Sequence, residues 1–285
     1  MTPIENKKIE NLFALLQNLE KVAVAFSGGV DSTLLAAAAK RALGDEAVAV
    51  TVDSPTLSAR ERDGAGELAE LLGIRHIILP VSELACPEFV QNDKERCYHC
   101  KKFRFEELCR WAEKEGIEWI VEGSNTDDLQ DYRPGMRAVK ELEKVRSPLL
   151  EAGFSKADIR ELSQLWDLPT WDKPAAACLA SRISYGIPLT EENLARVERA
   201  EEILASFCPP KSQFRVRDHG HIARIEAESE LLPLLAQPEK AAEIASSVGS
   251  LGFSWVTLDL AGYRMGSLNI QIGADKNPSG SISGN

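Results

Sequence analysis

Short apolar runs alternate with amphipathic segments along the first half of the chain. The apolar runs cover residues 22–26, 47–52, 75–81 and 117–121, and such runs indicate buried strands. Between them, apolar positions recur at helical spacing in residues 4–19, 33–39, 57–72 and 103–115. The alternation of strands with helices predicts an α/β domain. We expect a parallel, Rossmann-like sheet with helices on both faces.

The second half of the chain has a different pattern. Residues 126–150 are polar and rich in loop-forming residues. Ser155 begins a capping box and Thr190 precedes a charged segment, so each is expected to start a helix. Residues 214–226 alternate as a β-hairpin, and residues 255–260 read as a further strand. These elements predict a small α+β arrangement.

The change of pattern divides the chain into domains. We place a boundary near Gly186, after a segment rich in alanine and proline. This gives an α/β domain over 1–186 and a small α+β domain over 187–268. Residues 269–285 are rich in Gly, Ser and Asn, and we expect them to be a disordered tail.

A glycine loop, Ser27-Gly28-Gly29-Val30-Asp31-Ser32, joins the first apolar run to the alanine-rich helix. Its two glycines allow a tight turn and close approach to a ligand, because neither carries a Cβ. The helix that follows presents unpaired N–H groups and its positive dipole end, which stabilises an anion by roughly 0.3–1 kcal/mol. The loop therefore predicts a phosphate site. The alternative is a tight turn with Asp31 or Ser32 as the helix N-cap.

The phosphate loop of kinases and GTPases ends in Gly-Lys-Ser/Thr, whereas Asp31 stands near the place of that lysine here. An aspartate at this point suits the pyrophosphate part of ATP with Mg²⁺ as a bridge. The hexapeptide resembles the pyrophosphate loop (PP-loop) of the N-type ATP pyrophosphatases. That resemblance implies a Rossmann-like domain of the HUP type and an enzyme that splits ATP between its α and β phosphates.

Polar residues follow two other predicted strands. Asp53 and Ser54 end the second apolar run, and Gly123 follows the fourth. Ligands of open α/β sheets bind at the carboxyl ends of strands, so these residues are expected to line the nucleotide site. A polar loop start is the other interpretation of Asp53 and Ser54.

Composition limits the partners. The chain has 285 residues and a formal net charge of -11, which argues against a broad nucleic-acid-binding face. It contains no apolar run long enough to span a membrane, and its first ten residues lack the apolar core of a signal peptide. We therefore expect a cytoplasmic protein in which the six cysteines stay reduced.

Cys97 and Cys100 form a Cys-x-x-Cys pair within a lysine- and arginine-rich segment. Positive neighbours favour the thiolate, which binds metals and acts as a nucleophile. The spacing also fits a redox pair or half of a zinc site, in which His99 could take part. Cys178 is the candidate third ligand, and three cysteines on a [4Fe–4S] cluster leave one iron open for sulfide or substrate. Cys109 reads as a core residue, and Cys86 and Cys208 receive no role.

Further segments of the sequence match a known pattern together with the glycine loop. They are Asp131-Tyr132-Arg133-Pro134-Gly135, Ser147-Pro148-Leu149-Leu150, Trp171 to Gly186, Phe214-Arg215-Val216-Arg217 and Ile222-Ala223-Arg224-Ile225-Glu226. Over roughly Ile9 to Arg264, the chain resembles the LarE family. LarE enzymes are ATP-dependent sulfur transferases that build the nickel-pincer nucleotide cofactor of lactate racemase.

The resemblance implies a reaction in two steps. ATP adenylates a carboxylate of pyridinium-3,5-biscarboxylic acid mononucleotide, and sulfur then displaces AMP to give a thiocarboxylate. Some family members have only the cysteine that matches Cys178, and they give up its sulfur once. The presence of Cys97 and Cys100 is similar to the other branch, where three cysteines hold a [4Fe–4S] cluster with an extra sulfide on the free iron. The resemblance also implies a sulfide donor and a homo-oligomer, a trimer or hexamer.

Site roles follow from this chemistry. The loop residues would hold pyrophosphate and Mg²⁺, Lys101 would neutralise phosphate charge, and arginines of the second half would bind the mononucleotide phosphate. Lys101 could instead be a solvated lysine, and the arginines could belong to a solvated strand face. The expected site residues are Ser27, Gly28, Gly29, Asp31, Ser32, Asp53, Ser54, Cys97, Cys100, Lys101, Gly123, Cys178, Arg182, Glu201, Arg215, Arg217 and Glu226.

Two other functions remain open. A tRNA thiolation enzyme can also combine a PP-loop with three cluster cysteines, but it needs a basic RNA face, and the net charge of -11 argues against one. A nucleotide-binding sensor on the same fold would bind ATP without releasing pyrophosphate.

Overall fold

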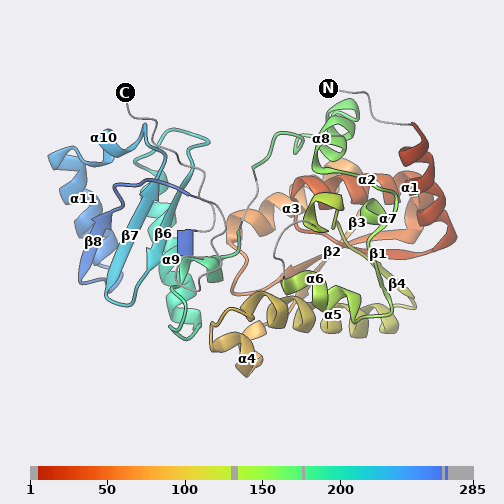
Figure 1. Cartoon of the computed structure of the whole chain (residues 1–285), viewed down its shortest axis with the longest axis horizontal. Helices are drawn as coiled ribbons and strands as arrows, with labels where there is room; N and C mark the ends of the chain where they lie inside the picture. The colour runs from red at the N-terminus through yellow and green to blue at the C-terminus, as the bar shows by residue number, and fades with distance from the viewer. Residues whose placement is uncertain (1–5, 130–133, 175–176, 265–266, 269–285) are drawn as a thin grey trace. The chain divides into compact units, whose positions relative to one another are not determined.

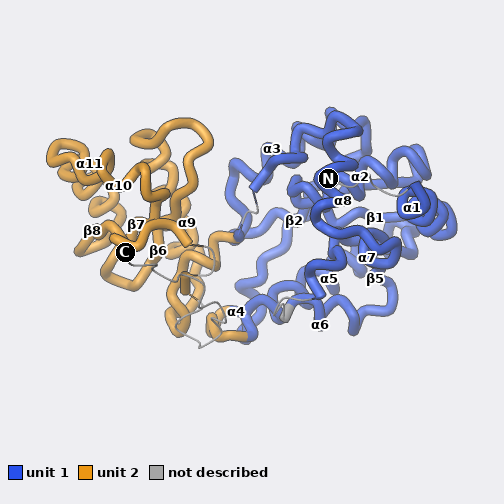
Figure 2. Tube along the Cα trace, turned by 45° about the horizontal axis from the view of Figure 1, so that its top comes forward, with its two compact units in different colours: residues 1–89, 95–177 blue, residues 90–94, 178–285 orange. Residues whose placement is uncertain are grey.

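In a computed structural model that describes residues 6–129, 134–174, 177–264 and 267–268, the chain divides into two units (Figure 2). The first unit comprises Met1–Phe89 and Glu95–Ala177, and the second comprises Val90–Lys94 and Cys178–Asn285. Apart from the pentapeptide Val90–Lys94, the second unit begins at Cys178, whereas the sequence favoured a boundary near Gly186. The expected domain limits stay predictions, and the tail 269–285 lies outside the described residues.

The first unit contains a five-stranded parallel sheet with the order β3-β2-β1-β4-β5. This confirms the predicted α/β fold class. The first four strands match the predicted apolar runs, and β5 was not predicted. The strands are β1 (Val22–Ala25), β2 (Ala47–Asp53), β3 (Arg75–Pro80), β4 (Trp119–Val121) and β5 (Val145–Arg146).

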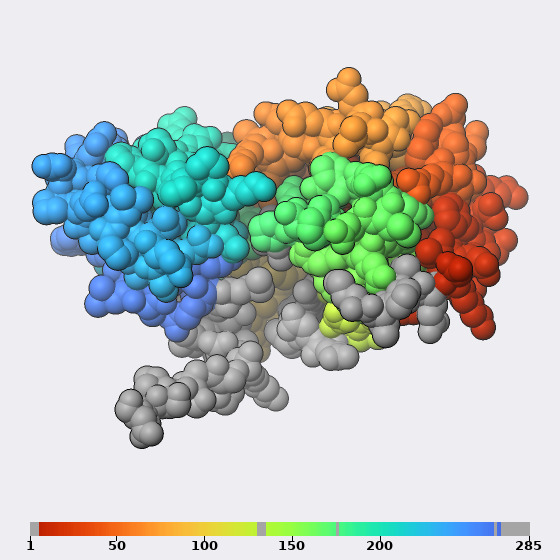
Figure 3. Space-filling view, turned by 90° about the horizontal axis from the view of Figure 1, so that it is seen from above, coloured from red at the N-terminus to blue at the C-terminus, as the bar shows by residue number. Residues whose placement is uncertain are grey.

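Helices cover both faces of this sheet (Figure 1). One face carries α1 (Asn6–Asn18), α2 (Val30–Leu43), α3 (Ala59–Leu72), α7 (Pro148–Glu151) and α8 (Lys156–Leu165). The outer surface of this layer shows residues of the first quarter of the chain beside residues near 160 (Figure 3). The other face carries α5 (Arg96–Lys114) and α6 (Pro134–Lys140), and α4 (Pro87–Val90) precedes them.

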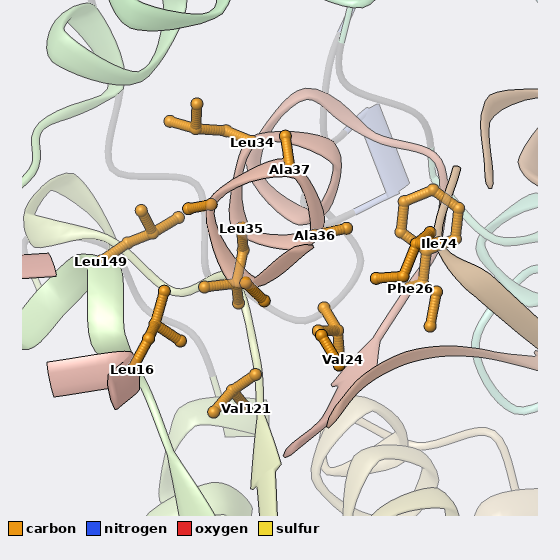
Figure 4. Packing of buried hydrophobic residues seen from close by; sticks show 14 of the residues in the cluster. Leu16, Val24, Phe26, Leu34, Leu35, Ala36, Ala37, Ile74, Val121 and Leu149 are labelled. Atoms are coloured by element: carbon orange, nitrogen blue, oxygen red, sulfur yellow. The ribbon is translucent and has the colours of Figure 1, made fainter. Parts of the chain in front are cut away.

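Helix α2 lies at the centre of the main core. Figure 4 shows Leu35 of α2 directed toward Leu16 of α1, Leu149 and Val121. All four side chains are fully buried, and so are the alanines Ala36, Ala38 and Ala39. Because alanine side chains are small, neighbouring elements approach the α2 backbone closely on several sides. This packing fixes the helix whose first turn carries the glycine loop.

The second unit contains a mixed three-stranded sheet with the order β6-β7-β8. Strands β6 (Phe214–Asp218) and β7 (Ile222–Ala227) form the predicted antiparallel hairpin, and β8 (Trp255–Leu258) runs parallel to β7. One face packs against α9 (Glu191–Ala205), α10 (Leu232–Leu235) and α11 (Pro238–Gly249). Val216, Ala223 and Ile225 point into this core, so the alternate residues of β6 and β7 lie on the opposite face.

The pentapeptide Val90–Lys94 is held by the second unit through Asn92. Asn92 is fully buried, and its φ of 54° lies in the left-handed region that asparagine tolerates. Its side-chain amide donates to the backbone oxygens of Ser184, at 2.9 Å, and Ile187, at 2.8 Å. Its own carbonyl accepts from the backbone N–H of Gly186 at 3.1 Å. The Asn92 side chain therefore links this pentapeptide to the backbone of residues 184–187.

Two local predictions were wrong. The helix expected from residue 103 begins at Arg96, so the Cys-x-x-Cys pair lies inside α5 rather than on a turn. The segment expected to be loop-rich, 126–150, contains β5 and two short α-helices, α6 and α7, as well as the 3₁₀ helix Thr126–Leu129. The predicted caps at Ser155 and Thr190 are confirmed, because each forms a complete capping box. Among the described residues, no helix is both long and apolar enough to cross a bilayer.

Candidate active site

The glycine loop connects β1 to α2 and closes on itself. Gly28 has a φ of +66°, and a Cβ there would lie 3.3 Å from the Cα of Ala65. The Ser32 hydroxyl donates to the Gly29 carbonyl at 3.2 Å and lies 3.2 Å from the Ser27 hydroxyl. Gly29 is the N-cap residue of α2, and no side-chain hydrogen bond caps this helix. The alternative in which Asp31 or Ser32 is the helix N-cap is therefore wrong. The loop has the backbone shape of a phosphate cradle.

Two lysines from later in the chain reach this loop. The Lys156 ammonium lies 2.7 and 2.6 Å from the two carboxylate oxygens of Asp31. The Lys173 ammonium donates to the Gly28 carbonyl at 2.8 Å. Sequence reasoning missed both residues, although the Ser155 capping box places Lys156 at the first position of α8. Two cations at a glycine loop suit a polyphosphate, and the Asp31 carboxylate is a suitable Mg²⁺ ligand.

Gly123, after β4, packs directly against the glycine loop. A Cβ at Gly123 would lie 3.1 Å from the Asp31 Cβ and 3.2 Å from the backbone nitrogen of Ser32. This close approach follows from the sheet order, because β1 and β4 are neighbours and their carboxyl ends meet. The structure therefore brings Gly123 to the loop.

Replacing Gly123 with alanine should destabilise the protein by about 1–3 kcal/mol and weaken ATP binding, because the new methyl group pushes Asp31 and Ser32 out of place. Gly66→Ala in α3 is the matched control, since nothing lies within 4 Å of a Cβ there. A helical Gly→Ala change at such a site is expected to stabilise by roughly 0.5–1 kcal/mol. Thermal unfolding and ATP titration check both variants, and equal behaviour of the two would contradict the prediction.

Lys101 is paired within the protein. Its ammonium lies 3.0 Å from the carboxylate of Glu122, which is 5% exposed at the end of β4. The Ser147 hydroxyl donates to Glu122 at 2.5 Å and the Ser124 backbone N–H donates at 3.2 Å. Burial opposes ionisation, but Lys101 and these hydrogen bonds outweigh it and hold the pKa of Glu122 below its ordinary value. The phosphate role of Lys101 stays a prediction, and Glu122 is a site residue that sequence reasoning did not assign.

Ser54 and Asp53 follow β2, as predicted, and Ser54 is buried. Arg104 of α5 donates to the Ser54 hydroxyl at 2.8 Å and pairs with the fully buried carboxylate of Glu83. The Asp53 carboxylate lies 3.7 Å from a guanidinium nitrogen of Arg62. Their nucleotide roles stay predictions.

The cysteine pair lies in the first two turns of α5. Cys97 and Cys100 are three residues apart, so their side chains leave the same side of the helix. Cys97 is exposed, and the Cys100 sulfur lies 3.9 Å from a carboxylate oxygen of Glu83. Cys178 belongs to the second unit, where it precedes the 3₁₀ helix Leu179–Arg182. Within the described residues, no group of three or more His, Cys, Asp or Glu side chains is arranged to hold a metal ion, so the cluster stays a prediction.

The other cysteines lie in less reactive surroundings. Burial raises the pKa of the Cys109 and Cys208 thiols, which pack beside hydrophobic clusters of the first and second unit. Burial also raises the pKa of Cys86, whose sulfur lies 3.4 Å from the Glu88 carboxylate. These thiols ionise less readily than an exposed cysteine does.

The second unit gathers arginines around two carboxylates. Arg182 forms a fork with Glu201 at 2.9 and 3.0 Å. The Nε and Nη2 groups of Arg217 both donate to one carboxylate oxygen of Glu226, at 2.9 and 2.8 Å, and Glu226 is fully buried. Both guanidinium groups belong to residues only 5% exposed, so a solvated strand face is excluded for Arg217.

Arg215 differs from these two arginines. Among the described residues its guanidinium forms no ion pair, and it lies 5.3 Å from the centre of the Tyr263 ring. Burial, followed by repulsion from Arg182, lowers the pKa of Arg215. Arg215 and Arg217 share one face of β6, as the sequence predicted. A half-buried cation without a carboxylate partner is a suitable place for an anionic ligand.

Comparison with known proteins places this geometry in a family. Residues 14–93 match the asparagine synthase family. The chain is 43% identical over 262 residues to an uncharacterized protein of Synechocystis sp., a match that covers 92% of this chain and 97% of that protein. It is 30% identical over 262 residues to an uncharacterized protein of Methanocaldococcus jannaschii, with 90% and 98% covered.

A third relative has an assigned activity. The chain is 38% identical over 271 residues to the pyridinium-3,5-bisthiocarboxylic acid mononucleotide synthase of Lactiplantibacillus plantarum, with 94% of this chain and 96% of the synthase covered. A match of this extent includes the glycine loop and both units. The chain therefore belongs to the LarE family of PP-loop sulfurtransferases, which contains that synthase.

Proposed function

We propose that the protein is an ATP-dependent sulfurtransferase that converts the carboxylates of pyridinium-3,5-biscarboxylic acid mononucleotide to thiocarboxylates. The product would be the precursor of the nickel-pincer nucleotide cofactor of lactate racemase. The observation that carries the proposal is the half-buried Arg215, a cation without an ion-pair partner among the described residues. A phosphate monoester would compensate its charge. The relative from Lactiplantibacillus plantarum supports the choice of substrate, because its match covers the second unit as well as the first.

The first step is adenylation in the first unit. The glycine loop and the N-terminus of α2 would bind the terminal phosphates of ATP, while Lys156 and Lys173 balance their charge. Bound Mg²⁺, with Asp31 as a ligand, would stabilise the negative charge that develops on the leaving pyrophosphate. A carboxylate oxygen of the substrate attacks the α-phosphorus, the bond to the bridging oxygen breaks, and pyrophosphate leaves with the electron pair.

The second step is sulfur transfer. We propose Cys97, Cys100 and Cys178 as thiolate ligands of a [4Fe–4S] cluster, and the helical spacing of Cys97 and Cys100 suits two thiolates on one metal centre. Such a cluster would supply one iron without a protein ligand, where inorganic sulfide can be held. The sulfide would act as the nucleophile toward the acyl carbon of the adenylate, and AMP would leave with the electron pair of the broken carbon–oxygen bond. The same two steps then act on the second carboxylate.

Product analysis tests this function. Protein reconstituted anaerobically with iron and sulfide is incubated with MgATP and the biscarboxylate mononucleotide, and AMP, pyrophosphate and thiocarboxylates are quantified. We expect two ATP molecules to be consumed for each bisthiocarboxylate, with many turnovers for each chain. Release of pyrophosphate without any thiocarboxylate, or sulfur transfer to tRNA in place of the mononucleotide, would contradict the proposal. A single turnover for each chain, with a decrease in the mass of the Cys178 peptide equal to one H₂S, would instead place the protein with the family members that give up their cysteine sulfur once.

We also propose that the enzyme acts in the cytoplasm as a homo-oligomer, a trimer or hexamer. All six cysteines are free thiols, as suits a reducing compartment. Light scattering on the purified protein measures the subunit number.

A further inference from the structure

The backbone carbonyl of Cys178 accepts an unusual number of hydrogen bonds. The Ser181 backbone N–H donates to it at 2.9 Å and the Ser181 hydroxyl donates at 2.7 Å. A guanidinium nitrogen of Arg182, Nη1, donates to it as well, at 3.1 Å. Because the carbonyl belongs to the cysteine itself, these bonds restrict the direction in which the thiol can point.

A second arginine holds the other end of the same turn. The Nη1 group of Arg217 donates to the Ser181 carbonyl at 3.0 Å. The Nε and Nη2 groups of Arg217 are both engaged by one oxygen of Glu226. The other oxygen of Glu226 accepts from Arg224 at 2.8 Å and from the Ser267 hydroxyl at 2.6 Å. Arg217 is thereby fixed by a fully buried carboxylate that is itself fully hydrogen-bonded.

The carboxylate that holds Arg182 is fixed in a similar way. Glu201 of α9 binds Nε and Nη2 of Arg182 and also accepts from the backbone N–H of Val216, at 3.1 Å. The chain after the turn is tied to β6, because the backbone N–H of Ser184 donates to the Asp218 carbonyl at 3.0 Å. The turn that follows Cys178 is thus attached to both α9 and β6 of the second unit.

We propose that the Arg182–Glu201 and Arg217–Glu226 pairs are positioning pairs for Cys178, and that Arg215 alone of the three arginines contacts the anionic phosphate. This inference rests on the proposed function and assigns its residues to separate tasks. Arg182 and Arg217 are almost completely buried, and their forks already bind carboxylates and the backbone of the cysteine turn. A phosphate could engage their forks only by displacing these partners, whereas the guanidinium of Arg215 forms no ion pair with a carboxylate in the part of the chain that the structure describes.

Glutamine substitutions at the two carboxylates test the division of tasks. Two quantities are measured on protein without metal: the alkylation rate of Cys178 by iodoacetamide, from peptide masses, and the affinity for nicotinic acid mononucleotide. In Glu201→Gln and Glu226→Gln we expect alkylation of Cys178 to rise about tenfold, because the arginine that holds the turn loses its charge-assisted partner. Arg215→Gln should leave alkylation unchanged and weaken mononucleotide binding about tenfold or more. Glu202→Gln, an exposed neighbour on α9, is the control and should change neither quantity.

A different result is expected if Arg182 and Arg217 bind the phosphate themselves. If Arg182 and Arg217 bind phosphate, release of their carboxylates should tighten mononucleotide binding and leave Cys178 alkylation at the wild-type rate, and that outcome would overturn the proposal. Arg182→Lys and Arg217→Lys provide a second test in case the glutamine variants fold poorly. Lysine keeps the positive charge but cannot form the fork, so we expect faster alkylation with mononucleotide affinity within about threefold of wild type. Wild-type alkylation in both lysine variants would also refute the positioning role.

Failure of the proposed function would give different results from failure of the positioning proposal. If the wild-type protein binds no nicotinic acid mononucleotide and forms no thiocarboxylate, the substrate assignment is lost. The alkylation rates would still report on the positioning of Cys178, because they are measured without substrate.

Discussion

Replacing Cys178 with serine should reduce thiocarboxylate formation by more than about a thousandfold while adenylation continues, because the two steps use different groups. A serine hydroxyl is a poor ligand for iron and cannot carry sulfur, so either branch of the family chemistry would lose its sulfur source. The glycine loop that would bind ATP lies in the first unit and is unchanged by the substitution. Pyrophosphate and thiocarboxylate measured in one reaction separate the two steps.

Cys109→Ser is the matched control. Cys109 is half-buried beside a hydrophobic cluster of the first unit, and burial raises the pKa of its thiol. We expect its sulfur transfer to stay near the wild-type level, with at most a small loss of stability. Sustained thiocarboxylate formation by Cys178→Ser would remove Cys178 from the mechanism, and full iron content in that variant would remove it from the ligand set.

Replacing Asp31 with asparagine should lower ATP–pyrophosphate exchange by about a hundredfold or more, because the carboxylate that we propose as the Mg²⁺ ligand beside the phosphates of ATP is lost. The change keeps the size of the side chain, and it breaks the ion pair in which Lys156 contacts both carboxylate oxygens. Released from Asp31, Lys156 can still attract phosphate. We therefore expect nucleotide binding without metal to be retained while exchange fails.

Asp45→Asn provides the comparison for this variant. Asp45 also pairs with a lysine, Lys40, but its side chain is 99% exposed and it follows the C-terminal end of α2, whereas the glycine loop lies at the N-terminal end of this helix. Exchange should be unaffected there. If Asp31→Asn kept exchange within about threefold of wild type, the assignment of Asp31 to the magnesium site would be wrong.

Much of the first unit could be predicted because its strands are continuous apolar runs. Strands β1 to β4 and the glycine loop follow from such runs and from their alternation with helices. Strand β5 has only two residues, Val145 and Arg146, and no pattern of that length separates a strand from a loop. Helix α5 was expected to start too late, because its first two turns, residues 96–102, consist of arginine, cysteine, tyrosine, histidine and lysine residues without an apolar period.

The contacts of the candidate site were harder to predict than its residues. Lys156 and Lys173 were missed because their partners, Asp31 and Gly28, are more than a hundred positions away in the chain. Glu226 lies opposite Arg215 in the hairpin, yet it pairs with Arg217 on the diagonal. Only side-chain direction and burial decide between these two partners, and neither can be read from the sequence.

The buried carboxamide of Asn92 has a practical consequence for protein engineering. It donates hydrogen bonds to backbone carbonyls of residues that come more than ninety positions later. A C-terminal fragment that starts at residue 178 would therefore leave those carbonyls without these hydrogen-bond donors. A chimera that exchanges the C-terminal half between relatives would need to transplant Val90–Lys94 together with it. A chimera that exchanges the C-terminal half without this pentapeptide is expected to misfold or to unfold at a lower temperature than its parent proteins.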